Sequence, residues 1–258
     1  LAERLQQAGY FTAAFSNNPF IGEMQNGLHR GFDQVVNYHY IGFRLWTTHL
    51  NQPNHDSSVD RSPGQRNVLS RLIDGKNQLT RKTLFAIWPL LEQALKSRGR
   101  SKNYNIKRSL TAASDLLVKR CQAKPGQPIF VFINLMGTHI PYAPPRWTFK
   151  RFVSPLVGER SMYKLLQRVN AFGLDVSNWL RTDSLQLEYK AAMDGLYDAE
   201  VAAQDAQLGQ FFETLRQNGA LDQTLLMIVA DHGEYLGERR RVNHLYGAYQ
   251  ELVHVPLI

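Results

Sequence analysis

The chain has 258 residues, of which 43% are hydrophobic and 20% charged, and its formal net charge is +8. A chain of this length and composition can fold around one sizeable hydrophobic core or two modest ones. The single cysteine, Cys121, excludes an internal disulfide framework, and no apolar run approaches the length that spans a membrane. The basic charge alone does not identify an anionic partner, and no aromatic and basic pattern typical of a nucleic-acid-binding module is present.

The first residues predict a short helix followed by a strand. Residues 1–8 have the spacing of an amphipathic helix, which we expect to end at Gly9, and residues 10–15 have a strand pattern. The sequence thus begins within a helical pattern and, at residues 255–258, finishes within a strand-like one. We therefore expect both ends to lie inside a longer polypeptide, and the lack of a signal peptide carries no information about the compartment.

Residues 34–107 are predicted to form a helical and irregular insertion. Residues 34–66 have little periodicity and many turn formers, which favours an irregular surface excursion. Residues 67–97 have helical spacing that Pro89 interrupts. Residues 97–107 are basic and are predicted to be a solvated linker.

The second half alternates between helical and strand patterns, in the order helix 109–121, strand 128–135, helix 186–218 and buried strand 225–230. Residues 146–185 have no clear pattern, and we interpret them as a lid or a substrate loop. Alternating helices and strands predict an α/β fold with a mostly parallel sheet. No repeat or domain boundary stands out, so residues 1–258 are interpreted as a single, partial domain.

Polar side chains follow both of the later strands directly. The strand at 225–230 runs into Asp231-His232-Gly233-Glu234, and His139 follows the strand at 128–135 by four residues. Chemistry in open α/β sheets lies beyond the carboxyl ends of the strands, so we expect these side chains to share one site. A carboxylate beside an imidazole suits a divalent metal ion, and at least two more ligands must come from elsewhere.

Other charged residues near this motif are interpreted more simply. His244 follows an arginine-rich stretch, residues 239–241, which is typical of a solvated face. Glu234 and Glu238 are expected to be surface acids rather than part of a site.

Four blocks of the sequence resemble the sulfatase family of the alkaline-phosphatase-like superfamily, in the family's order and approximate spacing. Together they cover about half of the chain. They are residues 1–15 with Gly31-Phe32-Asp33, residues 128–145 with Thr-His-Ile-Pro-Tyr, residues 197–209, and residues 221–234 with His244 and the C-terminal Val-Pro-Leu-Ile.

The resemblance implies an alkaline-phosphatase-like three-layer sandwich, with a central sheet between helices, and a sulfuric ester hydrolase that acts on a small-molecule or glycan sulfate monoester. It places Asp231 and His232 on a divalent metal, usually Ca²⁺ in sulfatases, with Zn²⁺, Mn²⁺ or Mg²⁺ as alternatives. It gives His139 and His244 catalytic and substrate-binding roles, since His139 matches the histidine that contacts the sulfate and protonates the leaving oxygen. Family habit suggests a periplasmic, secreted or lysosomal-type location, while the oligomeric state stays open.

Two elements of the family pattern are missing from these 258 residues. The family's nucleophile is a formylglycine made within a Cys/Ser-x-Pro-x-Arg motif, and this chain contains neither that motif nor an Asp-Asp metal pair. Residues 16–20, Ser-Asn-Asn-Pro-Phe, also replace the Gly-Lys-Trp-His element of many relatives. We expect the nucleophile and the metal pair to lie upstream of Leu1, and the 258 residues alone to be inactive.

Two other interpretations remain open. Superfamily members with a Thr or Ser nucleophile and zinc or manganese are phosphatases, phosphodiesterases or transferases of phospho-groups to lipids and glycans, and the basic charge does not separate them from sulfatases. A truncated or degenerate homologue without catalysis would keep Asp231 and His232 only as relics.

Overall fold

The computed structural model describes residues 1–18, 20–21, 26–38, 102–124, 126–153, 166, 169–170, 187–244 and 247–258. They belong to two compact units, residues 1–136 and residues 137–258. The helical pieces predicted between residues 67 and 97, and most of the lid or loop predicted at 146–185, lie outside the described residues. The interpretation of the whole chain as one catalytic domain with an insertion at 34–107 stays a prediction.

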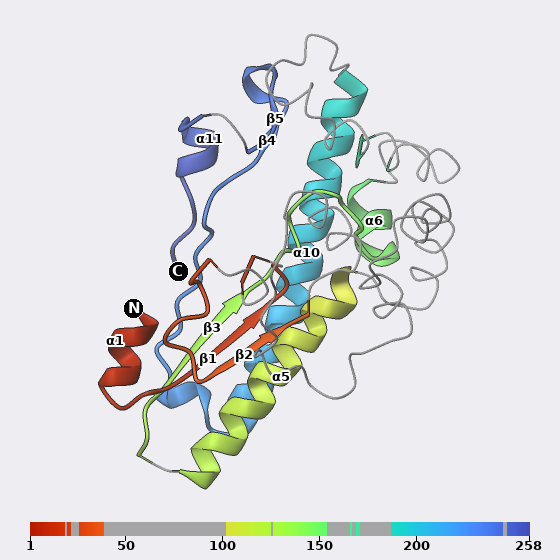
Figure 1. Ribbon diagram of the computed structural model, residues 1–258. Coiled ribbons are helices and arrows are strands. Elements are labelled where there is room, and N and C mark those ends of the chain that lie inside the picture. Colours follow the sequence, from red (N-terminus) through yellow and green to blue (C-terminus); the bar gives the residue numbers. More distant parts are fainter. Residues whose placement is uncertain are drawn as a thin grey trace, which may run out of the picture. The chain divides into compact units, whose positions relative to one another are not determined.

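A three-stranded parallel sheet forms the centre of the first unit (Figure 1). Its strands are β1 (Phe11–Ser16), β2 (Gln34–Asn37) and β3 (Ile129–Asn134), in the order β2-β1-β3, with Phe11 opposite Ile129. Strands β1 and β3 confirm the strands predicted from the sequence. Strand β2 corrects the prediction of irregular structure from residue 34 onward, because this short run owes its extended form to pairing with β1 rather than to its own pattern.

Two helices accompany this sheet in the first unit. Helix α1 (Ala2–Gln7) precedes β1 and is followed by Gly9 with φ +87°, as predicted. Helix α5 (Lys102–Ala123) packs against β1 and β3 (Figure 1). The prediction of a solvated linker up to residue 107 was wrong for its last six residues. Ile106, Leu110 and Ala113 are all buried, and this i, i+4, i+7 stripe extends the helix into the basic segment.

Asp33 joins the loop before β2 to the start of β1. Its Oδ2 accepts hydrogen bonds from the backbone N–H of Thr12 (2.8 Å) and from the Thr12 hydroxyl (3.0 Å), and its Oδ1 accepts one from Gln6 (2.6 Å). These donors favour the ionised form, with the Thr12 backbone N–H as the largest cause, and lower the pKa of the Asp33 carboxyl. The ionised side chain therefore stabilises the folded unit.

We expect Asp33→Asn to lower the free energy of unfolding by about 1 kcal/mol at neutral pH, because the amide loses one of these acceptors and Asp33 is largely exposed. A lowered folded-state pKa contributes stability that is present above the unfolded value, about 3.9, and is lost as the pH falls through the folded value. The difference between wild type and variant in urea unfolding should therefore shrink between pH 6 and pH 3. A difference that is the same at both pH values would contradict this assignment.

The second unit is built around the long helix α10 (Leu187–Gln217), which ends before Gly219 (φ +67°) as the sequence predicts. Its buried core joins α10, helix α6 (Arg146–Phe152), the loop before α6 and strand β5 (Val242–Asn243). The buried members of this core are Ile140, Tyr142, Phe149, Val153, Val169, Ala192, Met193, Leu196, Ala199 and Val242. The loop that carries His139 and the strand that precedes His244 are therefore held by one core.

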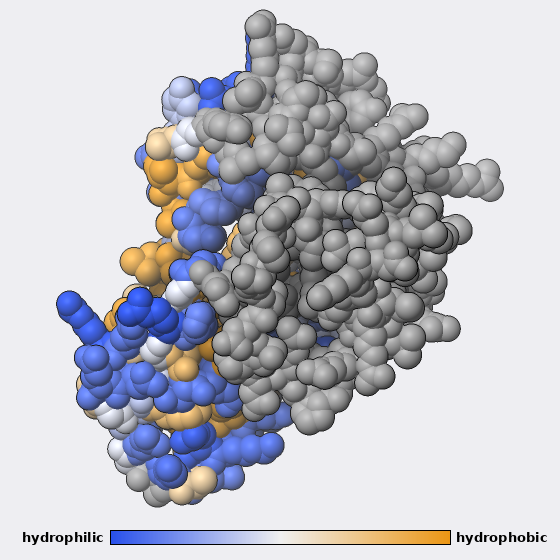
Figure 2. Space-filling model, in the orientation of Figure 1, coloured by the Kyte–Doolittle hydropathy of each residue, from blue (hydrophilic) through white to orange (hydrophobic). Residues whose placement is uncertain are grey.

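The apolar run at 225–230 corrects another prediction. It is extended but is not a buried strand, since Leu225, Met227 and Val229 are all at least 60% exposed. Within the described residues it has a single antiparallel bridge, between Val229 and Leu257, flanked by two 2.9 Å hydrogen bonds between the backbones of Ile228 and Ile258. Figure 2 shows hydrophobic surface on the side where the C-terminal segment runs. One bridge does not cover the side chains of a strand, so within the described residues the run is largely exposed.

No helix among the residues that the structure describes is long and apolar enough to cross a membrane.

Candidate metal and ester site

A short hairpin carries His244 in the second unit. Strands β4 (Tyr235–Leu236) and β5 pair antiparallel, and the 3₁₀ turn η2 (Glu238–Arg240) joins them. Asn243, at the end of β5, has φ +70°, and its side-chain Oδ1 accepts a hydrogen bond from the His244 N–H (2.8 Å). This left-handed residue, a conformation that Asn tolerates well, sets the direction in which His244 leaves the strand.

The turn of this hairpin contacts two other elements. The Glu238 carboxylate accepts a hydrogen bond from the backbone N–H of Leu236 (2.7 Å) and pairs with Lys190 of α10 (2.9 Å). Glu238 therefore links the hairpin turn to α10 and is not the simple surface acid that the sequence predicted. Arg239 is exposed, as predicted for the arginine run, and also pairs with Glu251 (3.1 Å) of helix α11 (Gln250–Val253).

Gly233 brings the backbone after Asp231 against α11. Its N–H donates a hydrogen bond to the carbonyl oxygen of Leu252 (2.8 Å), and a Cβ at this position would lie 2.0 Å from the carbonyl oxygen of Glu251. Only glycine allows this approach. The contact fixes the path of the chain between His232 and Glu234.

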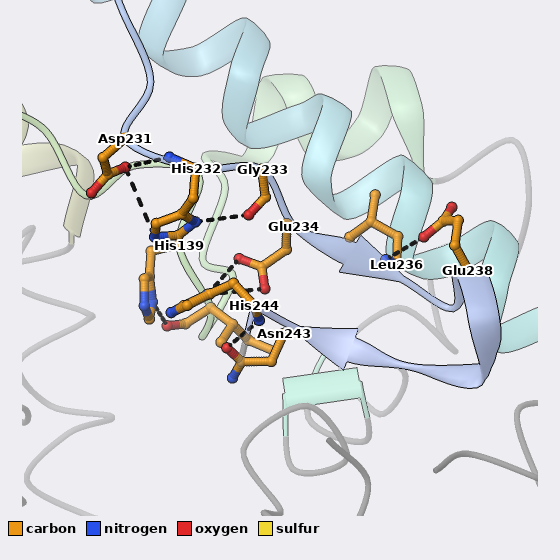
Figure 3. Close-up of polar contacts among 10 residues, drawn as sticks. His139, Asp231, His232, Gly233, Glu234, Leu236, Glu238, Asn243 and His244 are labelled. Atoms are coloured by element: carbon orange, nitrogen blue, oxygen red, sulfur yellow. Dashed lines mark hydrogen bonds and ion pairs between the residues drawn. The ribbon is translucent and has the colours of Figure 1, made fainter. Parts of the chain in front are cut away.

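Three imidazole rings gather at this point, beside Asp231 and Glu234 (Figure 3). The rings of His232 and His244 stack with their centroids 4.1 Å apart and an interplanar angle of 30°. The ring of His139 meets that of His244 edge-on, with centroids 5.0 Å apart and an angle of 67°. The structure thus brings together His139 and the two later histidines, which are about 100 residues away in the sequence.

The side chains of Asp231 and His232 bring together two atoms that can bind a metal ion, one oxygen and one nitrogen. His232 Nδ1 lies 2.7 Å from the carbonyl oxygen of Gly233, and because a carbonyl only accepts, Nδ1 carries a proton and Nε2 is the nitrogen left to bind a metal ion. Nε2 lies 3.8 Å from Asp231 Oδ1. Two ligands of one metal ion lie roughly 3–4 Å apart, so the pair can provide two ligands, with the second ring nitrogen held by a carbonyl as in many metal sites.

Two ligands do not complete a metal site. Within the described part of the chain, no three His, Cys, Asp or Glu side chains are grouped so that they could hold a metal ion. The Asp231 side chain is 78% exposed, whereas His232 is 37% exposed. Among the described residues, Asp231 and His232 are therefore a candidate pair of ligands without a complete ligand set.

Glu234 corrects the prediction of a surface acid. Its side chain is only 6% exposed, and its carboxylate oxygens lie 3.3 and 3.4 Å from Nδ1 of His244. The sequence contained one signal for this contact, since Glu234 directly follows the Asp-His-Gly motif at the point where the chain must turn back toward the site.

Further residues that the sequence did not single out hold the His139 loop. Asn170 makes two hydrogen bonds to the backbone of Tyr142 (2.7 and 2.8 Å), and Ala143 N–H donates to the buried Glu200 (2.5 Å). Glu200 lies in the block 197–209 that carries the family resemblance. Its contact with the loop is long-range in sequence and has no local pattern that could have predicted it.

Tyr197 of α10 contacts the loop that carries His139 and is influenced by the charge of Glu234. Its hydroxyl is hydrogen-bonded to Thr138, and burial, together with the nearby Glu234 carboxylate, raises the pKa of Tyr197. Burial likewise raises the pKa of Tyr142, with Glu234 as the next cause. Both phenols therefore stay neutral around Glu234 at physiological pH.

Comparison with known proteins shows which proteins this chain resembles. The chain is 29% identical over 120 residues to an arylsulfatase of Klebsiella aerogenes, which covers 42% of this chain and 26% of that protein. The whole chain superimposes on the crystal structure of a phosphonate monoester hydrolase of Agrobacterium radiobacter, with a TM-score of 0.52 and 17% identity.

The chain spans about half (51%) of that solved structure. The superposition agrees with the predicted α/β, alkaline-phosphatase-like fold, with helices flanking a parallel sheet, as a partial domain. The Sulfatase family matches residues 1–258, the full length of the sequence, so the chain belongs to the sulfatase family.

Proposed function

We propose that this chain is part of a metal-dependent hydrolase that cleaves a sulfate monoester, with Asp231, His232, His139 and His244 at the site of the reaction. The observation that carries the proposal is the gathering of these residues in one unit of a sulfatase-family protein, from segments about 100 residues apart. The matching family and the 29% identical arylsulfatase support a sulfate ester as the substrate.

In this proposal Asp231 Oδ1 and His232 Nε2 hold one side of a divalent metal ion, with Ca²⁺ expected from the family. When bound, such an ion neutralises negative charge on the ester oxygens. The carboxylate favours a hard cation, and the hydrogen bond from His232 Nδ1 to Gly233 keeps Nε2 directed to the metal side. Measuring which metal copurifies with the full-length protein distinguishes calcium from zinc or manganese.

His139 is proposed to protonate the oxygen of the leaving alcohol. Its Nδ1 faces the carbonyl oxygen of Ile140, which can only accept, so Nδ1 keeps its proton and the proton that is transferred is the one on Nε2. His244, stacked on His232, is proposed to bind the oxygens of the ester. The nucleophile is proposed to be a formylglycine from sequence outside these 258 residues, because the required motif is absent from them.

A panel of esters with the same leaving group tests the proposal. We expect full-length protein to hydrolyse p-nitrophenyl sulfate with a kcat/KM at least tenfold above those for p-nitrophenyl phosphate and p-nitrophenyl phenylphosphonate. Because the leaving group is constant, the ratio reports only the recognition of the transferred group. A preference for phosphate or phosphonate, together with bound zinc or manganese, would instead support a phospho-ester hydrolase or transferase. Hydrolysis of none of them would support the non-catalytic interpretation.

A further inference from the structure

Glu234 and His244 form a carboxylate–imidazole pair that the proposed reaction has not yet used. The Glu234 side chain is 6% exposed and His244 is 19% exposed, so water competes poorly for their contact. Both carboxylate oxygens lie within 3.4 Å of Nδ1. Since a carboxylate accepts, the proton of this contact is on Nδ1 of His244.

The His244 ring of this pair is packed against two other imidazole rings. One face of the His244 ring is stacked on His232, and its edge meets His139 (Figure 3). The charge of Glu234 also raises the pKa of Tyr142 and of Tyr197, after burial as the larger cause. Glu234 is therefore a largely buried carboxylate in direct contact with the imidazole cluster.

We propose that Glu234 is a positioning residue for His244: it sets the plane of the imidazole ring and holds the proton on Nδ1, so that Nε2 is the atom presented to the ester. The claim that Nε2 meets an ester rests on the proposed function, whereas the orientation of the ring by Glu234 does not. A histidine side chain can adopt three staggered χ1 rotamers, and a hydrogen bond to one buried acceptor favours a single rotamer among them.

Variants of equal size separate the hydrogen bond from packing. Glu234→Gln keeps an oxygen that accepts from Nδ1–H, whereas Glu234→Met fills the same space without an acceptor. Glu238→Met is the matched control, because it removes a carboxylate from the same hairpin that contacts Lys190 and Leu236 rather than a histidine.

Crystal structures of the full-length variants test the orientation without any activity. We expect His244 to keep its rotamer in Glu234→Gln and in Glu238→Met, and to rotate or split into two rotamers in Glu234→Met. A His244 ring that stays in its wild-type orientation in Glu234→Met would overturn the inference, whether or not the protein hydrolyses an ester.

Kinetics then test whether Glu234 acts through His244. With an aryl sulfate, Glu234→Met should lower kcat/KM by about tenfold to a hundredfold, and Glu234→Gln should restore most of that loss. In a His244→Ala background, Glu234→Met should cause no further loss, since its partner is gone. Losses that multiply in full in the double variant would overturn the inference. If wild-type protein cleaves no ester, the proposed function fails while the crystal structures still decide the role of Glu234.

Discussion

Asp231→Asn should lower kcat/KM of the full-length protein for an aryl sulfate by about a thousandfold or more. The amide has the shape of the carboxylate but not its charge, and metal stabilisation of the transition state is worth several kcal/mol, or about tenfold for each 1.4 kcal/mol. The hydrogen bond from the His232 N–H to Oδ1 (3.1 Å) should survive, since the amide oxygen of Asn still accepts, so the loss reports the missing charge. The loss should appear in metal content as well as in rate.

Asp222→Asn provides the control for this experiment. Asp222 is an exposed aspartate of the same unit, in the 3₁₀ helix η1 (Leu221–Gln223). We expect this variant to keep wild-type metal content and activity. If Asp231→Asn retained both its metal and its rate, Asp231 would not be a ligand and the proposed site would be wrong.

Gly233→Ala should destabilise the second unit strongly. The added Cβ would meet the carbonyl oxygen of Glu251 at 2.0 Å, and that atom belongs to the backbone of α11 and cannot rotate away. Overpacking of this kind costs about 1–3 kcal/mol, and here we expect the upper part of that range, with a lower free energy of unfolding in urea. Because Gly233 lies between His232 and Glu234, the shift should also displace the imidazole cluster and reduce activity.

Gly209→Ala makes the same chemical change where no backbone opposes it. Gly209 is an exposed residue within α10, and a Cβ there meets nothing within 4 Å. Alanine is the better helix former, so we expect this variant to be neutral or stabilised by up to about 1 kcal/mol. Equal stability of the two variants would show that α11 can move away from the added methyl group at little cost, and that Gly233 does not fix the path of the chain between His232 and Glu234.

The sequence predicted the elements whose patterns are local. Helices α1 and α10 and strands β1 and β3 were found close to their predicted bounds, because each has its own periodicity and an end marked by glycine or proline. The structure brings His139, His232 and His244 together, where the sequence pattern had placed His139 beside Asp231 and His232 and the family resemblance had added His244. Their roles at that site stay predictions until the proposed experiments are made.

The misses share a physical cause, which is that they depend on partners distant in the sequence. Strand β2 is extended because it pairs with β1, and the start of α5 depends on where Ile106 is buried. Glu234 looked like a surface acid because its partner, His244, lies ten residues away across a hairpin. The run at 225–230 shows the reverse case, since its apolar composition indicates a need for burial without specifying what covers it.

The most direct test of the whole account is a crystal structure of the full-length protein grown with calcium and inorganic sulfate. The account predicts a metal ion bound by Asp231 Oδ1 and His232 Nε2, with a sulfate oxygen within hydrogen-bonding distance of Nε2 of His139 and of His244. A metal ion held by other residues, or a sulfate that contacts neither histidine, would contradict it.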